Sequence, residues 1–138
     1  MMIPADDFKK YYDASGHQAG DALLKRFGVI FKESLRRVDC AARYGGDEFI
    51  VLLPEIEATG ALEVAERLRQ RVVAETTGEP ERVPVSLSFG VAAFPEHGET
   101  LEAIVASADS ALYEGKRCGR NRVVFAGDDP GPGMKMAV

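Results

Sequence analysis

Residues 43–49 read Arg-Tyr-Gly-Gly-Asp-Glu-Phe, and the interpretation of the whole chain begins from this stretch. It stands between two apolar runs, residues 40–42 and 49–53, that have the composition of β-strands. A Gly-Gly pair between strands predicts a tight hairpin, because glycine adopts positive φ angles at little cost. Two glycines also leave the backbone bare, so a ligand has room beside the carboxylates of Asp47 and Glu48. An ordinary turn with solvated acids fits the same tripeptide.

The composition limits the class of protein. A length of 138 residues is enough for one domain, and 46% apolar and 28% charged residues are typical of a globular protein. No apolar run approaches the roughly 20 residues that cross a bilayer, and no secretory signal opens the chain. The net charge of -5 argues against DNA or RNA as the main partner, although a small nucleotide stays compatible. Cys40 and Cys118 lack metal-site spacing and fit a reducing cytoplasm.

Helical and strand patterns alternate along the chain. After an apolar stub at residues 1–5, we expect helices at 8–13, 17–36, 59–74 and 100–117, and strands at 41–44, 48–53, 85–91 and 123–125. This order predicts an α+β fold with a ferredoxin-like antiparallel sheet flanked by helices. Residues 1–126 form the expected domain, and the Gly- and Pro-rich tail at 127–138 is expected to be disordered.

Several single positions carry predictions of their own. Asp6, Thr59 and Thr100 stand where helix N-caps are expected. Leu101 is expected inside the core with the other apolar residues of the last helix. Gly28 interrupts the second helix, which either close packing or simple tolerance would explain.

Four strings in the right order resemble the GGDEF family, the bacterial diguanylate cyclases. They are Phe-Lys-Lys with the later Gly-His and Gly-Asp pairs at residues 8–21, the hairpin at 43–49, Leu-Ser-Phe-Gly-Val at 87–91, and the closing segment at 109–121. The resemblance implies a palm-type fold, cytoplasmic location, and condensation of two GTP molecules into cyclic di-GMP with loss of pyrophosphate. It also implies Mg²⁺ or Mn²⁺ as cofactor, and a homodimer, since each subunit holds one GTP.

The resemblance also assigns roles to residues. Asp47 would be the metal ligand and, with Glu48, would form the catalytic pair, Glu48 assisting the 3′-hydroxyl or the metal. The substrate-binding residues would be Asp21 on guanine, Gly45 and Gly46 as bare backbone, and Lys116 and Arg120 on phosphates. Lys116 and Arg120 also fit a cationic helix C-terminus, and Asp21 fits an ordinary second-turn acid. His17 is expected to be structural.

A second binding site is implied just ahead of the hairpin. Arg36 and Asp39 form an Arg-x-x-Asp string that resembles the family's product-inhibition site for cyclic di-GMP, with Arg67 as a supporting arginine. By itself such a string is a weak signal, because it occurs by accident at many helix ends. Arginine suits the bidentate recognition of phosphate and guanine better than lysine does.

Two departures from the family pattern affect the function. Pro4 stands where the family places its first metal-binding aspartate, and Tyr12 where it places a guanine-reading asparagine. The opening strand also looks truncated, and no upstream sensory or receiver domain is part of this chain. We therefore weigh an active diguanylate cyclase against a degenerate domain that binds GTP or cyclic di-GMP, and against a purely structural scaffold. We expect slow GTP turnover, because one ligand of the metal is missing.

Overall fold

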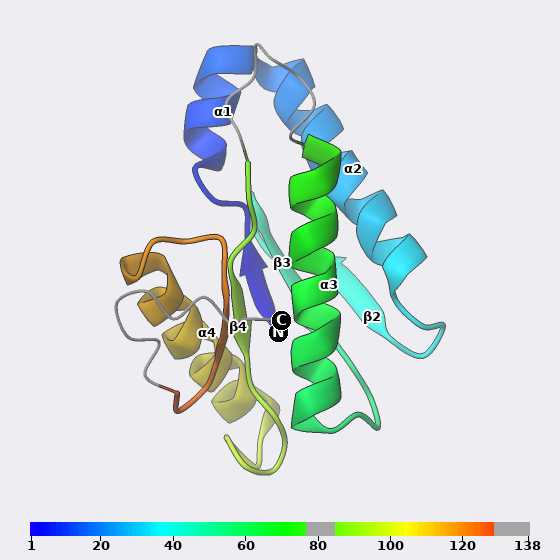
Figure 1. Ribbon diagram of the computed structural model, residues 1–138, viewed down its shortest axis with the longest axis vertical. Helices are drawn as coiled ribbons and strands as arrows, with labels where there is room; N and C mark the ends of the chain where they lie inside the picture. The colour runs from blue at the N-terminus through cyan, green and yellow to red at the C-terminus, as the bar shows by residue number, and fades with distance from the viewer. Residues whose placement is uncertain (77–84, 129–138) are drawn as a thin grey trace.

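The structure, a computed structural model, describes residues 1–76 and 85–128 (Figure 1). Its strands are β1 (Met2–Pro4), β2 (Cys40–Arg43), β3 (Glu48–Leu52), β4 (Phe89–Val91) and β5 (Val123–Phe125). Its helices are α1 (Phe8–Ser15), α2 (His17–Ser34), α3 (Ala58–Thr76) and α4 (Leu101–Arg117). The element order is the one that the sequence predicts. The expected disordered tail at 127–138 falls mostly outside the described residues.

The described strands form one sheet in the order β2-β3-β1-β4-β5. β1 lies at its centre and pairs antiparallel with β3 and β4, and β2 pairs antiparallel with β3. These four strands have the ferredoxin-like order that the sequence predicts. β5 is an addition at the edge and pairs parallel with β4, because α4 carries the chain back between them. The sheet is therefore mixed rather than wholly antiparallel.

Helices cover both faces of the sheet. Ile3 on β1 belongs to the main core beneath α2 and α3, whereas the preceding Met2 faces α4 and contacts Ala108 and Leu112. Successive strand residues point to opposite faces, so this short strand serves two cores. Figure 1 shows α2 and α3 side by side along the sheet, with α4 beside β4.

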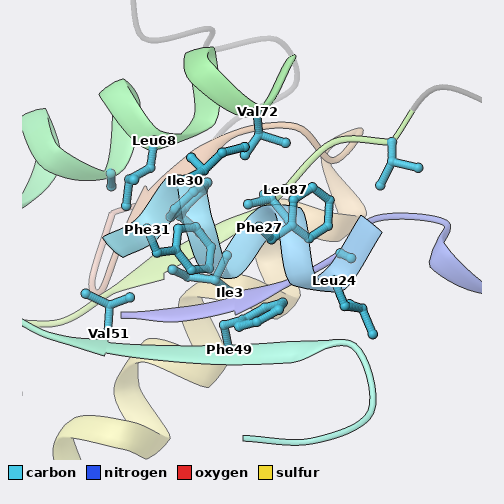
Figure 2. Close-up of a cluster of buried hydrophobic side chains, with 14 of the residues drawn as sticks. Ile3, Leu24, Phe27, Ile30, Phe31, Phe49, Val51, Leu68, Val72 and Leu87 are labelled. Carbon is cyan, nitrogen blue, oxygen red and sulfur yellow. The ribbon is translucent and has the colours of Figure 1, made fainter. Parts of the chain in front are cut away.

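Phenylalanine and aliphatic side chains fill the main core (Figure 2). Phe49 of β3 lies edge-on to Phe31 of α2, with ring centroids 5.2 Å apart, and Figure 2 shows Leu68 and Val72 of α3 approaching from the other side. Burying side chains of this size stabilises a fold by about 1.5–3 kcal/mol each. The burial expected of the apolar residues of the strand predicted at 85–91 is confirmed, since Val85, Leu87, Phe89 and Val91 are all buried. Ser88 and Gly90 between them are buried as well, and the strand itself spans only Phe89–Val91.

Local details differ from the sequence predictions at three positions. Asp6 does not cap α1, because its carboxylate is buried and bonded to serine hydroxyls instead. Thr59 lies inside α3 rather than ahead of it. Leu101 is 62% exposed, so its expected place in the core is wrong. The Thr100 cap is confirmed, since its hydroxyl accepts from the Ala103 N–H at 3.2 Å.

Candidate functional site

The hairpin between β2 and β3 is held by its own backbone and by one arginine. The N–H groups of Tyr44 and Gly45 both donate to the Glu48 carbonyl, at 2.8 and 3.2 Å. Arg43 folds over the turn, and its Nε donates to the Gly46 carbonyl at 2.9 Å. The Asp47 carbonyl accepts from the Ala5 N–H at 2.9 Å, which fixes the turn against the residue after β1. The turn is therefore anchored from both sides.

The glycines of the turn leave its backbone bare without adopting an unusual backbone conformation. Neither Gly45 nor Gly46 has a positive φ angle, so the reason given for them above is wrong in that respect. A Cβ added at Gly46 would meet nothing within 4 Å. At Gly45 it would lie 3.3 Å from Oε2 of Glu48, so this carboxylate borders the bare backbone. The second expectation, backbone open to a ligand next to acids, is consistent with this geometry.

Two carboxylates stand at this turn. Asp47 and Glu48 are both half-buried, and within residues 1–76 and 85–128 no hydrogen bond or ion pair engages either side chain. In the same described residues, no group of three or more His, Cys, Asp or Glu side chains is arranged to hold a metal ion. Mg²⁺ is commonly bound through one or two carboxylates together with substrate phosphates. The donors fit a cation shared with a nucleotide, not one enclosed by protein alone.

Pro4 lies directly beside these acids. It is buried at the end of β1 and pairs with Glu48 across the two strands. Directly paired residues share a face of the sheet, so an acid at position 4 would add a carboxylate next to Glu48. Proline also lacks the N–H that this position would direct toward β4, since Asp6 donates to the Ser86 carbonyl on that side.

A groove of about 890 Å³ runs between α2 and β2 and brings several predicted residues together. Asp21, Arg36, Asp39 and Arg43 all line it. The whole chain carries a net charge of -5, but cations outnumber acids in this groove. Its charged lining comprises five cations, Lys25, Lys32, Arg36, Arg37 and Arg43, and two acids, Asp21 and Asp39. Such a local excess of positive charge favours an anionic ligand.

The three residues of the predicted inhibition site are neighbours in space. Arg36 donates to Asp39 through Nη2 at 2.7 Å and also to the Pro54 carbonyl at 2.9 Å. Hydrogen bonds from Arg36 hold the pKa of the Asp39 carboxyl below its usual range, and the charge of Arg67 contributes to the same shift. Arg67 donates to the carbonyl of Ser34, at the end of α2. Two arginines therefore flank one buried carboxylate.

Lys116 and Arg120 lie at and beyond the end of α4. The helix ends at Arg117, so Arg120 belongs to the following turn and not to a helical face. Its backbone is left-handed, with φ of 60°, and its N–H donates to the Gly115 carbonyl at 3.2 Å. In the described part of the chain, no hydrogen bond or ion pair engages the cationic group of either residue.

Tyr12 occupies the space between the first two helices. Its hydroxyl contacts Nδ1 of His17, and the two rings meet edge-on with centroids 4.4 Å apart. The ring also covers Gly20, where an added Cβ would clash with it. The structural role expected of His17 is consistent with this contact. Asp21, the next residue along α2, stays exposed.

Sequence reasoning missed a polar network behind the site. The buried Asp6 carboxylate accepts from the hydroxyls of Ser86 and Ser88, each at 2.7 Å, and from the Asn121 N–H at 3.1 Å. Arg69 of α3 donates to Oδ1 of Asn121 at 2.9 Å. The partners of Asp6 are far from it in sequence, so no local pattern could have indicated them.

Sequence comparison relates the chain to known proteins. The profile of the family described as "Diguanylate cyclase, GGDEF domain" matches residues 1–122. Diguanylate cyclase A of Treponema denticola is 42% identical over 127 residues, which cover 91% of this chain and 34% of that protein. The response regulator PleD of Caulobacter vibrioides is 38% identical over 131 residues, covering 90% of this chain and 28% of the relative. The chain thus spans about a third or less of these relatives.

Solved structures agree with the sequence comparison. The active GGEEF domain of a diguanylate cyclase from Vibrio cholerae has a TM-score of 0.84 at 30% identity, covering 92% of this chain and 81% of that one. The GGDEF domain of DgcB from Caulobacter crescentus, in complex with c-di-GMP, has a TM-score of 0.83 at 31% identity, covering 92% and 76%. In the described residues, no helix is both long and apolar enough to span a membrane. The chain belongs to the GGDEF family.

Proposed function

We propose that this chain binds GTP at the β2–β3 hairpin and condenses two GTP molecules into cyclic di-GMP, with slow turnover. The observation that carries the proposal is the pair of carboxylates, Asp47 and Glu48, beside the open backbone of Gly46; neither has a hydrogen-bond or ion-pair partner among residues 1–76 and 85–128. The cation-rich groove that begins at Arg43 and reaches Asp21 supports an anionic nucleotide as the ligand.

The reaction joins each 3′-hydroxyl to the α-phosphate of the other GTP. Two phosphodiester bonds form and two pyrophosphates leave, so two domains must face each other as a homodimer. Lys116 and Arg120 bind phosphate oxygens, Asp21 accepts from the guanine edge, and Glu48 accepts the proton of the attacking hydroxyl. Asp47 would hold a divalent cation such as Mg²⁺ or Mn²⁺, which would supply neutralisation of charge on the triphosphate. Positioning and electrostatics account for most of such catalysis.

Pro4 is the reason to expect slow turnover. It offers no oxygen where a second carboxylate would stand opposite Glu48. Removing one preorganised donor from an oxyanion hole lowers the rate by about 10²–10³-fold, and we expect a missing acid at this site to have an effect of similar size.

Two substitutions at position 4 distinguish the effect of a carboxylate on turnover from the effect of a backbone N–H. Pro4→Asp restores both an N–H and an acid, whereas Pro4→Ala restores the N–H alone. We expect cyclic di-GMP formation from GTP and Mg²⁺ to rise about tenfold or more for Pro4→Asp and to stay unchanged for Pro4→Ala. Robust turnover by the parent chain, or equal rates for both variants, would reject the missing acid as the cause.

A second candidate function is a binding module that recognises cyclic di-GMP without making it. The cluster of Arg36, Asp39 and Arg67 favours it, and so does Tyr12, whose hydroxyl already contacts His17. The DgcB domain with c-di-GMP bound shows that a similar fold accepts this ligand.

Calorimetry with cyclic di-GMP tests this candidate. Arg36→Ala should weaken binding about tenfold or more, because it removes a charged donor and leaves Asp39 buried without its main partner. Arg37→Ala is the matched control, since this neighbouring arginine lines the same groove without touching Asp39. Equal binding by the parent and Arg36→Ala would remove the site.

The cellular setting is part of the proposal. The relatives named above are bacterial and much longer, and one of them is named a response regulator. We place the domain in the bacterial cytoplasm, working with a sensory or receiver domain that brings two copies together. Fusing a dimeric receiver domain ahead of Met1 should raise turnover per domain, with dimerisation followed by analytical ultracentrifugation. Unchanged turnover in a dimeric fusion would reject this arrangement.

A further inference from the structure

Two adjacent residues after β1 connect the two halves of the proposed triphosphate site. The Ala5 N–H donates to the Asp47 carbonyl at 2.9 Å, on the hairpin. The Asp6 carboxylate accepts from the Asn121 N–H at 3.1 Å, in the turn after α4. Hairpin and turn are far apart in sequence, and these bonds bring Asn121 and its neighbour Arg120 into a fixed relation with Asp47.

The turn after α4 has a backbone that requires outside support. Gly119, Arg120 and Asn121 have φ angles of 110°, 60° and 46°, so two non-glycine residues in succession are left-handed. Residues with a side chain rarely adopt this backbone conformation unless their surroundings impose it. The Arg120 carbonyl accepts from Nε of Arg122 at 3.3 Å, and Asn121 is held at both its N–H and its side chain.

The side-chain support of Asn121 comes from a partly buried ion pair on α3. Arg69 donates to Oδ1 of Asn121 at 2.9 Å while its Nε and Nη2 bind the two Glu66 oxygens at 2.8 and 2.6 Å. Gln70 donates to the same carboxylate at 2.9 Å. A buried ion pair is weak evidence for stability, because desolvation offsets its attraction, and its best-attested role is to fix a register.

We infer that Asp6 and the Arg69–Asn121 contact are positioning groups that hold Arg120 ready for the nucleotide phosphates opposite Asp47. This inference rests on the proposed function. A guanidinium whose backbone is already fixed loses less freedom on binding, so the tether raises affinity without touching the ligand.

The test uses Asn121→Gly, which removes the side-chain acceptor of Arg69 and leaves the left-handed backbone conformation accessible. Glycine accepts a φ of 46°, and the Glu66–Arg69 pair stays intact, so the fold is preserved. Glu55→Gly is the matched control, because Glu55 is also left-handed, with φ of 53°, and lies in the loop after β3. Calorimetry with GTP and Mg²⁺ is run on both variants, on Arg120→Ala, and on the double variant Asn121→Gly/Arg120→Ala. Circular dichroism verifies that each is folded.

We expect Arg120→Ala to bind GTP about tenfold more weakly and Asn121→Gly about fivefold more weakly, with Glu55→Gly unchanged. The double variant should bind no more weakly than Arg120→Ala, because the tether acts only through Arg120. Asn121→Asp, which keeps an oxygen for Arg69, should recover part of the affinity.

The outcomes separate the two ideas. If Asn121→Gly binds like the parent, or if the two effects multiply, the positioning role is overturned while the proposed function stands. If Arg120→Ala binds like the parent, or the parent takes up no GTP, the proposed phosphate site fails, and the inference fails with it.

Discussion

Gly90 offers a sharp test of how α4 sits on the sheet. A Cβ built at this position would lie 1.9 Å from the carbonyl oxygen of Ala108 and 2.9 Å from the backbone nitrogen of Leu112. Both obstructing atoms are helix backbone, which cannot turn aside as a flexible side chain can. Real Cβ atoms essentially never approach closer than 3.0 Å, so Gly90→Ala must move α4 away from β4 by about 1.1 Å or more.

The expected cost follows from this displacement. Overpacking costs typically 1–3 kcal/mol, and backbone obstruction places Gly90→Ala near the upper end, partly offset by about 0.4–1 kcal/mol from the stiffer unfolded chain. We expect a net loss of about 2–3 kcal/mol, and a melting temperature lower by roughly 5–12 °C. Urea denaturation followed by circular dichroism measures the loss, with an unchanged m value.

Gly28→Ala is the control, because we expect it to change the free energy of unfolding in the opposite direction. Gly28 lies inside α2, and an added Cβ there meets nothing within 4 Å, so tolerance and not close packing explains this glycine. The same chemical change should therefore stabilise the protein by about 0.5–1 kcal/mol. A Gly90→Ala protein as stable as the parent, or stabilised like Gly28→Ala, would refute the proposed contact between α4 and β4.

Three further predictions concern stability. The Met1 ammonium donates to the Val51 carbonyl at 2.8 Å, and burial lowers its pKa from 8.0 to about 6. Because the unfolded chain binds this proton more tightly, a protein that begins at Met1 should lose up to about 2.7 kcal/mol of unfolding free energy from pH 8 to below pH 6, and N-terminal acetylation should abolish that loss in pH-dependent melts. Thr100→Ala should cost about 1 kcal/mol in urea denaturation through the lost N-cap, whereas Thr100→Ser should cost little. Leu101→Ala should change stability by less than about 0.5 kcal/mol and Leu112→Ala should cost about 2–5 kcal/mol, so similar losses would contradict their different burial.

Local patterns predicted most of the element order but not the long-range polar contacts. The alternation ending at Val91 and the glycines of residues 43–49 identify their elements from neighbours alone, because periodicity reflects which face is buried. Asp6 precedes a helix and therefore resembles a cap, yet its partners lie just before β4 and after α4. Leu101 is apolar and helical, but it is the first residue of α4 and its side chain is mostly exposed.

For the candidate site, the sequence likewise predicted which residues take part but not how they are paired. The sequence indicates which residues carry charge, and the groove between α2 and β2 brings Asp21, Arg36 and Asp39 to one surface. It does not indicate that Arg36 already binds Asp39, or that the hydroxyl of Tyr12 is engaged by His17. Such pairings depend on tertiary geometry, which decides whether a polar group is available to a ligand.

The exposure of β2 has a consequence for how this domain can evolve. All four of its residues, Cys40–Arg43, face solvent at the rim of the sheet, while the opposite wall of the groove presents long flexible lysines. Substitutions at exposed positions usually change the free energy of unfolding very little. If the groove binds a nucleotide as proposed, natural variation along β2 can change ligand preference while the core stays constant, and a library randomised only in β2 should yield folded proteins with altered nucleotide selectivity.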